Sequence, residues 1–294
     1  SNLWRREHEF AYQNLSSRVN EKLVAHSLRY GFPIGRSRVT FDGTYSRSRA
    51  DILNNAFETE GVSRQLSGRH EFPIADALGD RWSFTDQSFT YGFDYKHNEG
   101  NVFFTLFGSP IDAGASTNVH LINLMAAYEG RISDSWGGEN LLAGELYFSP
   151  GSLTSLNQDE EFDVARDGAQ STYLYSRLSL DRSTPLKVPF LEDPLSFDTA
   201  LRAQITGSRL LGSEQFTTGG YAGLRGYHTS AFSGDYGYTG SFELNSPAFN
   251  FFEGQINDAF RMGTFMDFGT VGIINPRDDE SKFNSLLSTG LTVD

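Results

Sequence analysis

A two-residue alternation of side-chain types recurs along most of this chain and is the feature that most constrains its fold. Between Tyr236 and Leu244, every second residue is aromatic, aliphatic or glycine, whereas most residues between them are polar and include Glu243. Successive side chains of a β-strand point to opposite faces, so this pattern is typical of a strand with one apolar and one polar face. The repetition of the pattern predicts an all-β protein.

We count roughly fourteen strand candidates of about ten residues, the length that crosses a bilayer in a tilted barrel strand. Most of them fall in 24–32, 38–46, 89–96, 102–106, 122–128, 142–148, 173–181, 198–205, 236–244, 259–269 and 287–293. A turn is expected at 97–100 between two of these runs. Long polar connections are expected at 51–61, 108–117, 151–169 and 181–195, and no amphipathic helix is expected. Tight turns at one end and long loops at the other are typical of outer-membrane barrels.

The polar faces carry charged residues along their whole length, which argues against a soluble β-sandwich. A sandwich core cannot hold unpaired charge without a cost of several kcal/mol, whereas a water-filled lumen can. We therefore predict a transmembrane antiparallel β-barrel, with a many-stranded soluble β protein as the alternative. The predicted lipid-facing residues include Phe41, Tyr91, Leu178, Phe242 and Met266, and the predicted lumen-facing residues include Arg38, Asp94, Arg177, Glu243 and Asp267.

Composition excludes several other classes of protein. The 294 residues contain no cysteine, so disulfides and cysteine-ligated metals are excluded. The net charge is −13 and no run of Lys or Arg occurs, which argues against a nucleic-acid partner. No stretch approaches eighteen apolar residues, so no transmembrane helix is expected. A mean hydropathy of −0.40 does not exclude a barrel, because only alternate residues of its strands face lipid.

No enzymatic or metal-binding motif stands out. The chain has no G-x-S-x-G, H-E-x-x-H or P-loop sequence, and its six histidines show no metal-ligand spacing. The acidic run 158–161 is predicted to be solvated loop surface, and a calcium site there lacks the spacing of an EF-hand. We predict no enzymatic activity, no catalytic residue, no cofactor and no metal, although an outer-membrane hydrolase with rim residues stays an alternative.

Two motifs lie about forty residues apart near the end of the chain. The first contains Gly219-Gly220, then Leu224-Arg225-Gly226-Tyr227, then Gly234-Asp235 and Gly237 at a loop-to-strand turn. The second is Phe265-Met266-Asp267-Phe268-Gly269, in a strand whose parity points Asp267 into the lumen. Gly263 and Gly269 are expected to leave space for an approaching loop. Without further information, Arg225 and Asp267 could also be an ordinary turn arginine and an unrelated strand aspartate.

This pair of motifs resembles the sixth extracellular loop and the F-x-D-x-G strand of two-partner secretion transporters. These are the haemolysin activator and filamentous haemagglutinin transporter family, related to the barrel-assembly insertases. One departure is Leu224, where the family more often has Val or Ile. The resemblance implies that Leu224, Arg225, Gly226 and Tyr227 fold into the lumen. There, Arg225 would meet the inner-wall motif formed by Phe265, Asp267 and Gly269.

The resemblance also implies a function and a location. The protein would sit in the outer membrane of a Gram-negative bacterium and secrete a large exoprotein that arrives unfolded from the periplasm. Its partners would be that client and outer-membrane lipid, and the client's identity is open. The alternatives are a barrel-assembly insertase and a passive porin. Because the family has sixteen strands and periplasmic POTRA domains, we expect residues 1–294 to be one barrel domain truncated at both ends.

Overall fold

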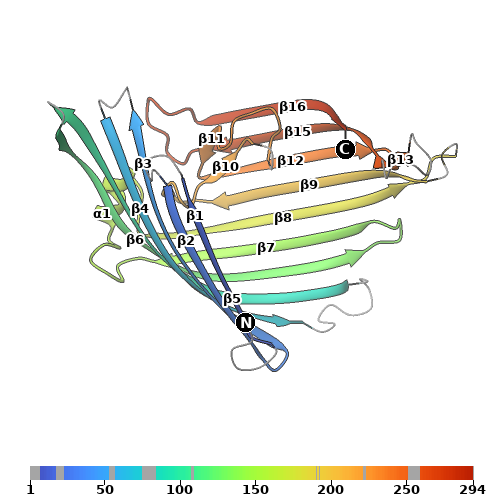
Figure 1. Ribbon diagram of the computed structural model, residues 1–294, viewed down its shortest axis with the longest axis horizontal. Coiled ribbons are helices and arrows are strands. Elements are labelled where there is room, and N and C mark those ends of the chain that lie inside the picture. The colour runs from blue at the N-terminus through green and yellow to red at the C-terminus, as the bar shows by residue number, and fades with distance from the viewer. Residues whose placement is uncertain are drawn as a thin grey trace. The chain divides into compact units, whose positions relative to one another are not determined.

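The computed structural model is an antiparallel β-protein, and its described residues include one short helix (Figure 1). It describes residues 7–17, 23–52, 57–74, 84–106, 109–189, 191, 193–220, 223–250 and 259–293. Its main sheet has twelve strands in the order β1-β2-β3-β4-β5-β6-β7-β8-β9-β12-β15-β16. Neighbours in the sheet are therefore also neighbours in sequence, apart from short inserted elements. The sequence predicted about fourteen strand candidates, and its all-β class is confirmed.

The strands of the main sheet differ greatly in length. They are β1 (Glu9–Ser16), β2 (Leu23–Ile34), β3 (Ser37–Ile52), β4 (Phe57–Pro73), β5 (Phe84–Leu106), β6 (Ser109–Ser133), β7 (Glu139–Pro150), β8 (Thr172–Leu186), β9 (Leu195–Thr206), β12 (Tyr236–Asn245), β15 (Met262–Gly272) and β16 (Phe283–Val293). Two ribbons are separate from it: β10 (Phe216–Thr218) with β11 (Phe232–Gly234), and β13 (Phe249–Asn250) with β14 (Ala259–Phe260). Helix α1 spans Asp159–Ala165.

Several expected boundaries are wrong. Strands β1 and β4 were not predicted, and residues 109–117 belong to β6 instead of a loop. Residues 97–100 do not turn but continue β5, since His97 and Glu99 contact neighbouring strands. Such cross-strand pairs stabilise extended backbone. The acidic run from residue 158 was expected to be loop, yet Asp159 begins helix α1.

The chain divides into two compact units, which are described separately. Unit 1 comprises 1–73, 89–126 and 147–174, and unit 2 comprises 74–88, 127–146 and 175–294. Both units show the two faces that the alternation predicts. In unit 1, Phe41 is 43% exposed, whereas Asp94 is only 3% exposed. In unit 2, Met266 is 41% exposed while the adjacent Asp267 is 1% exposed.

The buried charge on the polar face of unit 1 is paired. Asp94 accepts a hydrogen bond from Arg69 Nη2 at 2.6 Å and another from Ser67 Oγ at 2.5 Å, both on its Oδ1 atom. Register places Arg69 on β4, the neighbour of β5, so the contact joins adjacent strands. A buried carboxylate with both a cation and a hydroxyl donor avoids most of the desolvation cost of an isolated charge.

Helix α1 and the loop around it form a small apolar core in unit 1. The Phe162 side chain is fully buried, and its ring centroid lies 6.2 Å from that of Tyr173. The loop docks on β6, because His120 N donates to Leu156 O at 2.7 Å and Asn157 Nδ2 donates to His120 O at 2.9 Å. The expected loop at 151–169 is thus a packed structure. No pattern in seven helical residues could have predicted this packing.

The β6–β7 turn of unit 2 is organised around Asp134. Its Oδ1 atom accepts hydrogen bonds from Trp136 N at 2.9 Å and Gly138 N at 3.0 Å, and Arg182 bonds its Oδ2 atom. These bonds, above all the one from Gly138, lower the pKa of Asp134 to about 2. Hydrogen bonds to the ionised form of a carboxyl favour that form.

Removal of the Phe162 ring is expected to open the loop around α1. Phe162→Ala should destabilise this packing by about 3–5 kcal/mol, as for other buried aromatic side chains. Amide exchange in residues 151–171 should accelerate accordingly. Val164→Ala, at a site 70% exposed on the same helix, is the matched control and should exchange like the natural protein. Equal exchange in both variants would contradict the packing role of Phe162.

The Asp134 turn should give the protein an acid-dependent component of stability. Because the folded pKa of Asp134 lies below its ordinary value of 3.8, its contribution is complete above that value. It is then lost as the pH falls through about 2. Denaturant unfolding at a series of pH values between 5 and 2 measures this loss of stability, because about three pH units include both the ordinary and the folded pKa of Asp134. Asp134→Asn should show a shallower decline than the natural protein, and identical declines would contradict the prediction.

Candidate functional site

The loop between β10 and β11 in unit 2 carries the first motif. The β10–β11 ribbon closes the base of this loop, with Phe216 opposite Gly234 and Thr218 opposite Phe232. Inside it, Gly220 N donates to Tyr227 O at 3.2 Å, so the described part of the loop turns back on itself. Gly219 has φ 105°, and a Cβ atom there would lie 2.4 Å from His228 O. Only glycine fits both constraints.

Arg225 and Asp267 are in direct contact. The Nε atom donates to Asp267 Oδ2 at 2.8 Å, and Nη2 donates to Oδ1 at 2.8 Å. The Arg225 backbone N–H also donates to Oδ2 at 3.0 Å. Asp267 is 1% exposed, so nearly all of its hydrogen-bonding capacity is met within the protein. This is the bidentate arrangement that a planar guanidinium makes with a carboxylate.

The remaining N–H donors and the planar face of the Arg225 guanidinium group also have partners. Nη1 donates to Glu243 Oε2 at 2.5 Å, and Nη2 donates to Ser241 Oγ at 3.0 Å. The Phe265 ring centroid lies 3.6 Å from the guanidinium carbon, a cation–π distance. One cation thus faces two carboxylates. The hydrogen bond to Asp267, followed by those to Glu243, raises the pKa of Arg225 above its ordinary value, against the effect of burial.

The strand register explains how β12 and β15 assemble this cluster. Ser241 lies opposite Asp267, and Glu243 lies opposite Phe265, so the four side chains share one face of two adjacent strands. This alternation places every second residue of each strand toward Arg225. The interpretation of Asp267 as a residue of the polar face agrees with this geometry.

The other motif residues have identifiable structural positions. Leu224 is fully buried, and a Cβ atom at Gly269 would lie 2.9 Å from its Cδ1 atom. Gly269 therefore leaves space for the loop, as expected. Gly263 does not, because a Cβ atom there would meet Asn245 Oδ1 at 2.1 Å. Tyr227 donates from its hydroxyl to Leu287 O of β16 at 2.9 Å. Gly226 has φ 87°.

Asp235 does more than terminate a turn. Its carboxylate is fully buried and accepts hydrogen bonds from Leu210 N at 2.9 Å and Ile274 N at 2.8 Å. Its backbone N–H donates to Gly272 O at 2.8 Å. The flanking glycines are required by close approach, since a Cβ at Gly237 would lie 2.5 Å from Thr270 O. Asp235 therefore connects two other loops to the base of the motif loop.

A second ion pair joins the same two loops and was not predicted from the sequence. Arg209 Nη2 contacts both oxygens of Glu280, at 2.8 and 2.9 Å, and its Nη1 donates to Ile274 O at 3.0 Å. Arg209 is 7% exposed. Gln204 Nε2 also reaches this region and donates to Asp235 O at 2.9 Å. Only the β9 alternation could have indicated Gln204, and no sequence pattern identifies Arg209 or Glu280.

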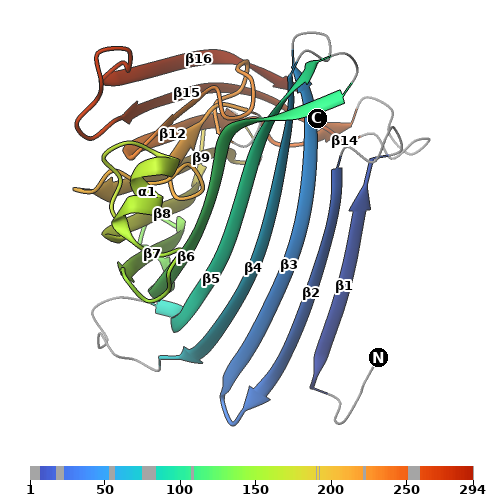
Figure 2. The ribbon, with the colours of Figure 1, turned by 90° about the vertical axis from the view of Figure 1, so that its left-hand side faces the viewer.

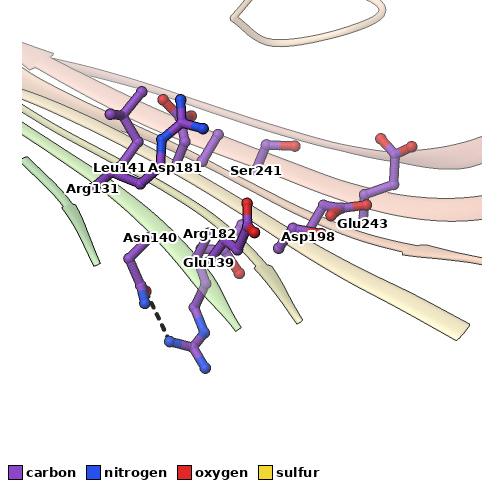
Figure 3. Close-up of a pocket in the computed structure, with 12 residues that line it drawn as sticks. Arg131, Glu139, Asn140, Leu141, Asp181, Arg182, Asp198, Ser241 and Glu243 are labelled. Atoms are coloured by element: carbon purple, nitrogen blue, oxygen red, sulfur yellow. Dashed lines mark hydrogen bonds between the residues drawn. The ribbon is translucent and has the colours of Figure 1, made fainter. Parts of the chain in front are cut away.

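Glu243 also belongs to a hollow on the polar face of unit 2, shown in Figure 3. This cavity of about 440 Å³ is bordered mainly by polar and charged side chains of β6–β9 and β12, including Arg131, Glu139, Asp181, Asp198 and Ser241. Asp181 is paired with Arg202 at 2.7 Å. Among the described residues, no three or more His, Asp or Glu side chains gather as a metal site would require. A charged hollow thus adjoins the Arg225 cluster.

A family model described as haemolysin secretion/activation protein ShlB/FhaC/HecB matches residues 136–293, more than half of the chain. The chain belongs to this family. The match includes both motifs and all the residues that surround Arg225. The family consists of β-barrel transporters of the Gram-negative outer membrane, which is therefore the location of this protein. The family is not known for enzymatic activity.

Solved structures support the same fold. CdiB from Escherichia coli matches with a TM-score of 0.67 and 15% identity, covering 92% of this chain and 47% of that one. CdiB from Acinetobacter baumannii matches with a TM-score of 0.62 and 14% identity, covering 97% and 46%. BamA from Haemophilus ducreyi, lacking POTRA domains 1–3, matches with a TM-score of 0.53 and 14% identity, covering 92% and 56%.

These likenesses show the fold, that of a transmembrane antiparallel β-barrel. The chain spans about half the length of these solved structures. No curated protein matches it. Among the described residues, no helix has the length and hydropathy needed to cross a bilayer.

The Arg225–Asp267 contact should hold the loop in place, and its two partners should be energetically coupled. Arg225→Ala and Asp267→Ala should each loosen the loop by about 1.5–3 kcal/mol, because each strands a charged partner in a confined site. The double variant should be little worse than either single one. Arg225→Lys should restore the anchoring only in part, because an ammonium lacks the planar fork.

Amide exchange of residues 223–231, measured for all four variants, quantifies this coupling. Ser246→Ala serves as the control, because Ser246 is a polar residue that directly follows β12 and lies outside the Arg225 cluster. Strictly additive effects of the two alanine substitutions would show that the two side chains do not stabilise the loop together.

Proposed function

We propose that this protein secretes a large exoprotein across the outer membrane as a two-partner secretion transporter. The observation that carries the proposal is the seating of Arg225 against Asp267, which holds a long loop on the polar face of the sheet. The family match supports transport. The client would enter unfolded from the periplasm and leave through the lumen.

In this proposal the motif residues have distinct roles. Leu224, Arg225, Gly226 and Tyr227 form the tip of the loop in the lumen, and Phe265, Asp267 and Gly269 form its seat on the barrel wall. Gly234, Asp235 and Gly237 fix the base of the loop. Passage of a polypeptide requires the tip to leave its seat. The charged hollow beside Glu243 offers water and polar groups to an unfolded chain, which carries unsatisfied backbone donors and acceptors.

The role of the tip can be tested by comparing secretion with solute flux. In the full-length protein, replacement of Leu224 to Tyr227 by a glycine-serine linker of equal length should abolish secretion of the cognate exoprotein. The reason is that the proposed transport needs a tip that both occupies its seat and leaves it, and the linker could not occupy the seat. Passage of small solutes should continue or increase. Secreted exoprotein in the medium and solute uptake by intact cells provide the two measurements.

A matched substitution in an exposed loop position, Trp136→Ala in the β6–β7 turn, should leave both measurements unchanged. Normal exoprotein secretion by the linker variant would refute the transporter assignment. Normal secretion with defective assembly of other outer-membrane barrels would instead favour an insertase.

A further inference from the structure

Residues 207–216, which we name the covering segment, lie on the polar face of unit 2 beside the base of the motif loop. Gln204 of β9 lies beneath this segment and is fully buried. Its Nε2 atom donates to Glu214 O and to Asp235 O, each at 2.9 Å. One residue of the barrel wall thus holds both the covering segment and the base of the motif loop.

Strand β8 holds the covering segment as well. The Tyr175 hydroxyl donates to Glu214 Oε2 at 2.6 Å, and both residues are fully buried. Arg177 Nε donates to Gln204 Oε1 at 2.8 Å, which orients the Gln204 amide toward the two carbonyl groups that it binds. Because buried polar groups need partners of fixed geometry, these bonds define one position for the covering segment on the wall.

The β10–β11 ribbon, which continues from the covering segment, rests on the next two strands. A Cβ atom at Gly237 of β12 would lie 2.9 Å from Phe216 Cδ1, and one at Gly269 of β15 would lie 2.9 Å from Thr218 Oγ1. Both glycines share the parity of the polar face, so the ribbon lies on that face too. The base of the motif loop therefore contacts the wall over several strands.

Arg209 ties the covering segment to the connection between β15 and β16, strands that lie side by side in Figure 2. Its Nη2 atom contacts both Glu280 oxygens, and Nη1 donates to Ile274 O and Asn275 O, each at 3.0 Å. The Arg209 side chain is buried. A planar guanidinium group can reach a carboxylate and two carbonyl groups at once, whereas an ammonium group cannot reproduce this geometry.

Asp235 holds the same two segments through their backbone. Its carboxylate accepts hydrogen bonds from the N–H of Leu210, the residue after Arg209, and from the N–H of Ile274. The carbonyl group of Ile274 is in turn bound by Arg209. A buried cation and a buried carboxylate thus act on the same short stretches of chain. Loss of either one should loosen the base of the motif loop.

We infer that Arg209 is a positioning residue for secretion, which fixes the base of the motif loop so that only the tip moves when a client passes. Within the described part of the chain, Arg209 contacts Glu280, Ile274 and Asn275 but neither Arg225 nor Asp267. It therefore acts through the covering segment and Asp235. A short tether with a fixed base returns the tip to Asp267 at little entropic cost. The inference rests on the proposed secretion function.

The first test measures whether Arg209 fixes the base. Arg209→Ala should accelerate amide exchange of residues 207–216 and 232–235 by between about 10- and 100-fold, because it leaves Glu280 and two carbonyl groups without their cation. Arg209→Lys should restore slow exchange only in part. Asp279→Ala is the matched control, since Asp279 is an exposed carboxylate next to Glu280. Exchange in Arg209→Ala equal to that of the control would overturn the inference.

The second test asks whether a covalent link can replace the ion pair. The 294 residues contain no cysteine, so Arg209→Cys combined with Glu280→Cys introduces only two thiols. In the full-length protein, this double variant should lose exoprotein secretion while heat-dependent electrophoretic mobility shows that it is folded. A short bis-methanethiosulfonate cross-linker, applied to intact cells, should restore secretion, and a reductant should abolish it again. A variant that was merely misassembled would not respond to the cross-linker.

The cross-linking result separates this inference from the proposed function. A cross-link that blocks secretion or fails to restore it would overturn the inference, as would normal secretion by the untreated double variant. Blocked secretion would mean that the covering segment and the β15–β16 connection must separate during passage. Failure of the proposed function itself would be recognised differently, by normal secretion when Leu224 to Tyr227 are replaced by a linker.

Discussion

The seating of the motif loop's tip depends on a single guanidinium group, that of Arg225, in a confined site. Asp267 is almost completely buried, and a buried carboxylate without a cation costs several kcal/mol. Arg225 supplies that cation from a loop, not from the barrel wall, so the seat is satisfied only when the loop is folded in. Glu243 strengthens this dependence, because it adds a second negative charge that no strand residue in the cluster neutralises. The strand pair β12–β15 is thus built to retain a loop.

Elsewhere on the polar face, two ion pairs each join neighbouring strands. Arg69 meets Asp94 in unit 1, and Arg202 meets Asp181 in unit 2. These pairs join neighbouring strands, so they do not depend on any loop. The Arg225 cluster differs in that its cation comes from outside the sheet. When a loop moves, the ion pairs within the barrel wall keep both partners, whereas Asp267 and Glu243 lose the guanidinium group of Arg225.

The sequence predicted the fold class because the alternation of side chains is a short-range rule, which also placed Asp267 and Met266 on opposite faces. The contact between Arg225 and Asp267 was implied by the resemblance of the two motifs to those of a known family, and no short-range rule predicted it. Strand β4 escaped prediction because its outward face contains Glu60, Arg64 and His70 as well as Leu66 and Phe72, so polar and apolar residues share one parity.

Contacts between distant segments could not be predicted from the sequence for a different reason. Arg209 and Glu280 are 71 residues apart, and the buried carboxylate of Asp235 joins backbone amides that have no side-chain signature. Helix α1 is seven residues long, too short for a periodic pattern, and its stability comes from burial of Phe162. Such features depend on which segments the sheet brings together, and local propensity does not encode that.

The two attachments of the motif loop differ in chemistry, and this difference bears on the proposed transport. At the base, Asp235 and the β10–β11 ribbon hold the chain through bonds to backbone amides, which lie in a region closed to water. At the tip, Arg225 is held by charge, and Asp267 and Glu243 attract any cation that reaches them. In the proposed transport, a positively charged segment of a passing polypeptide would compete with Arg225 for these two carboxylates while the base stays attached. The client would displace the tip in this way, and the intact base would return it to its seat once the client has passed.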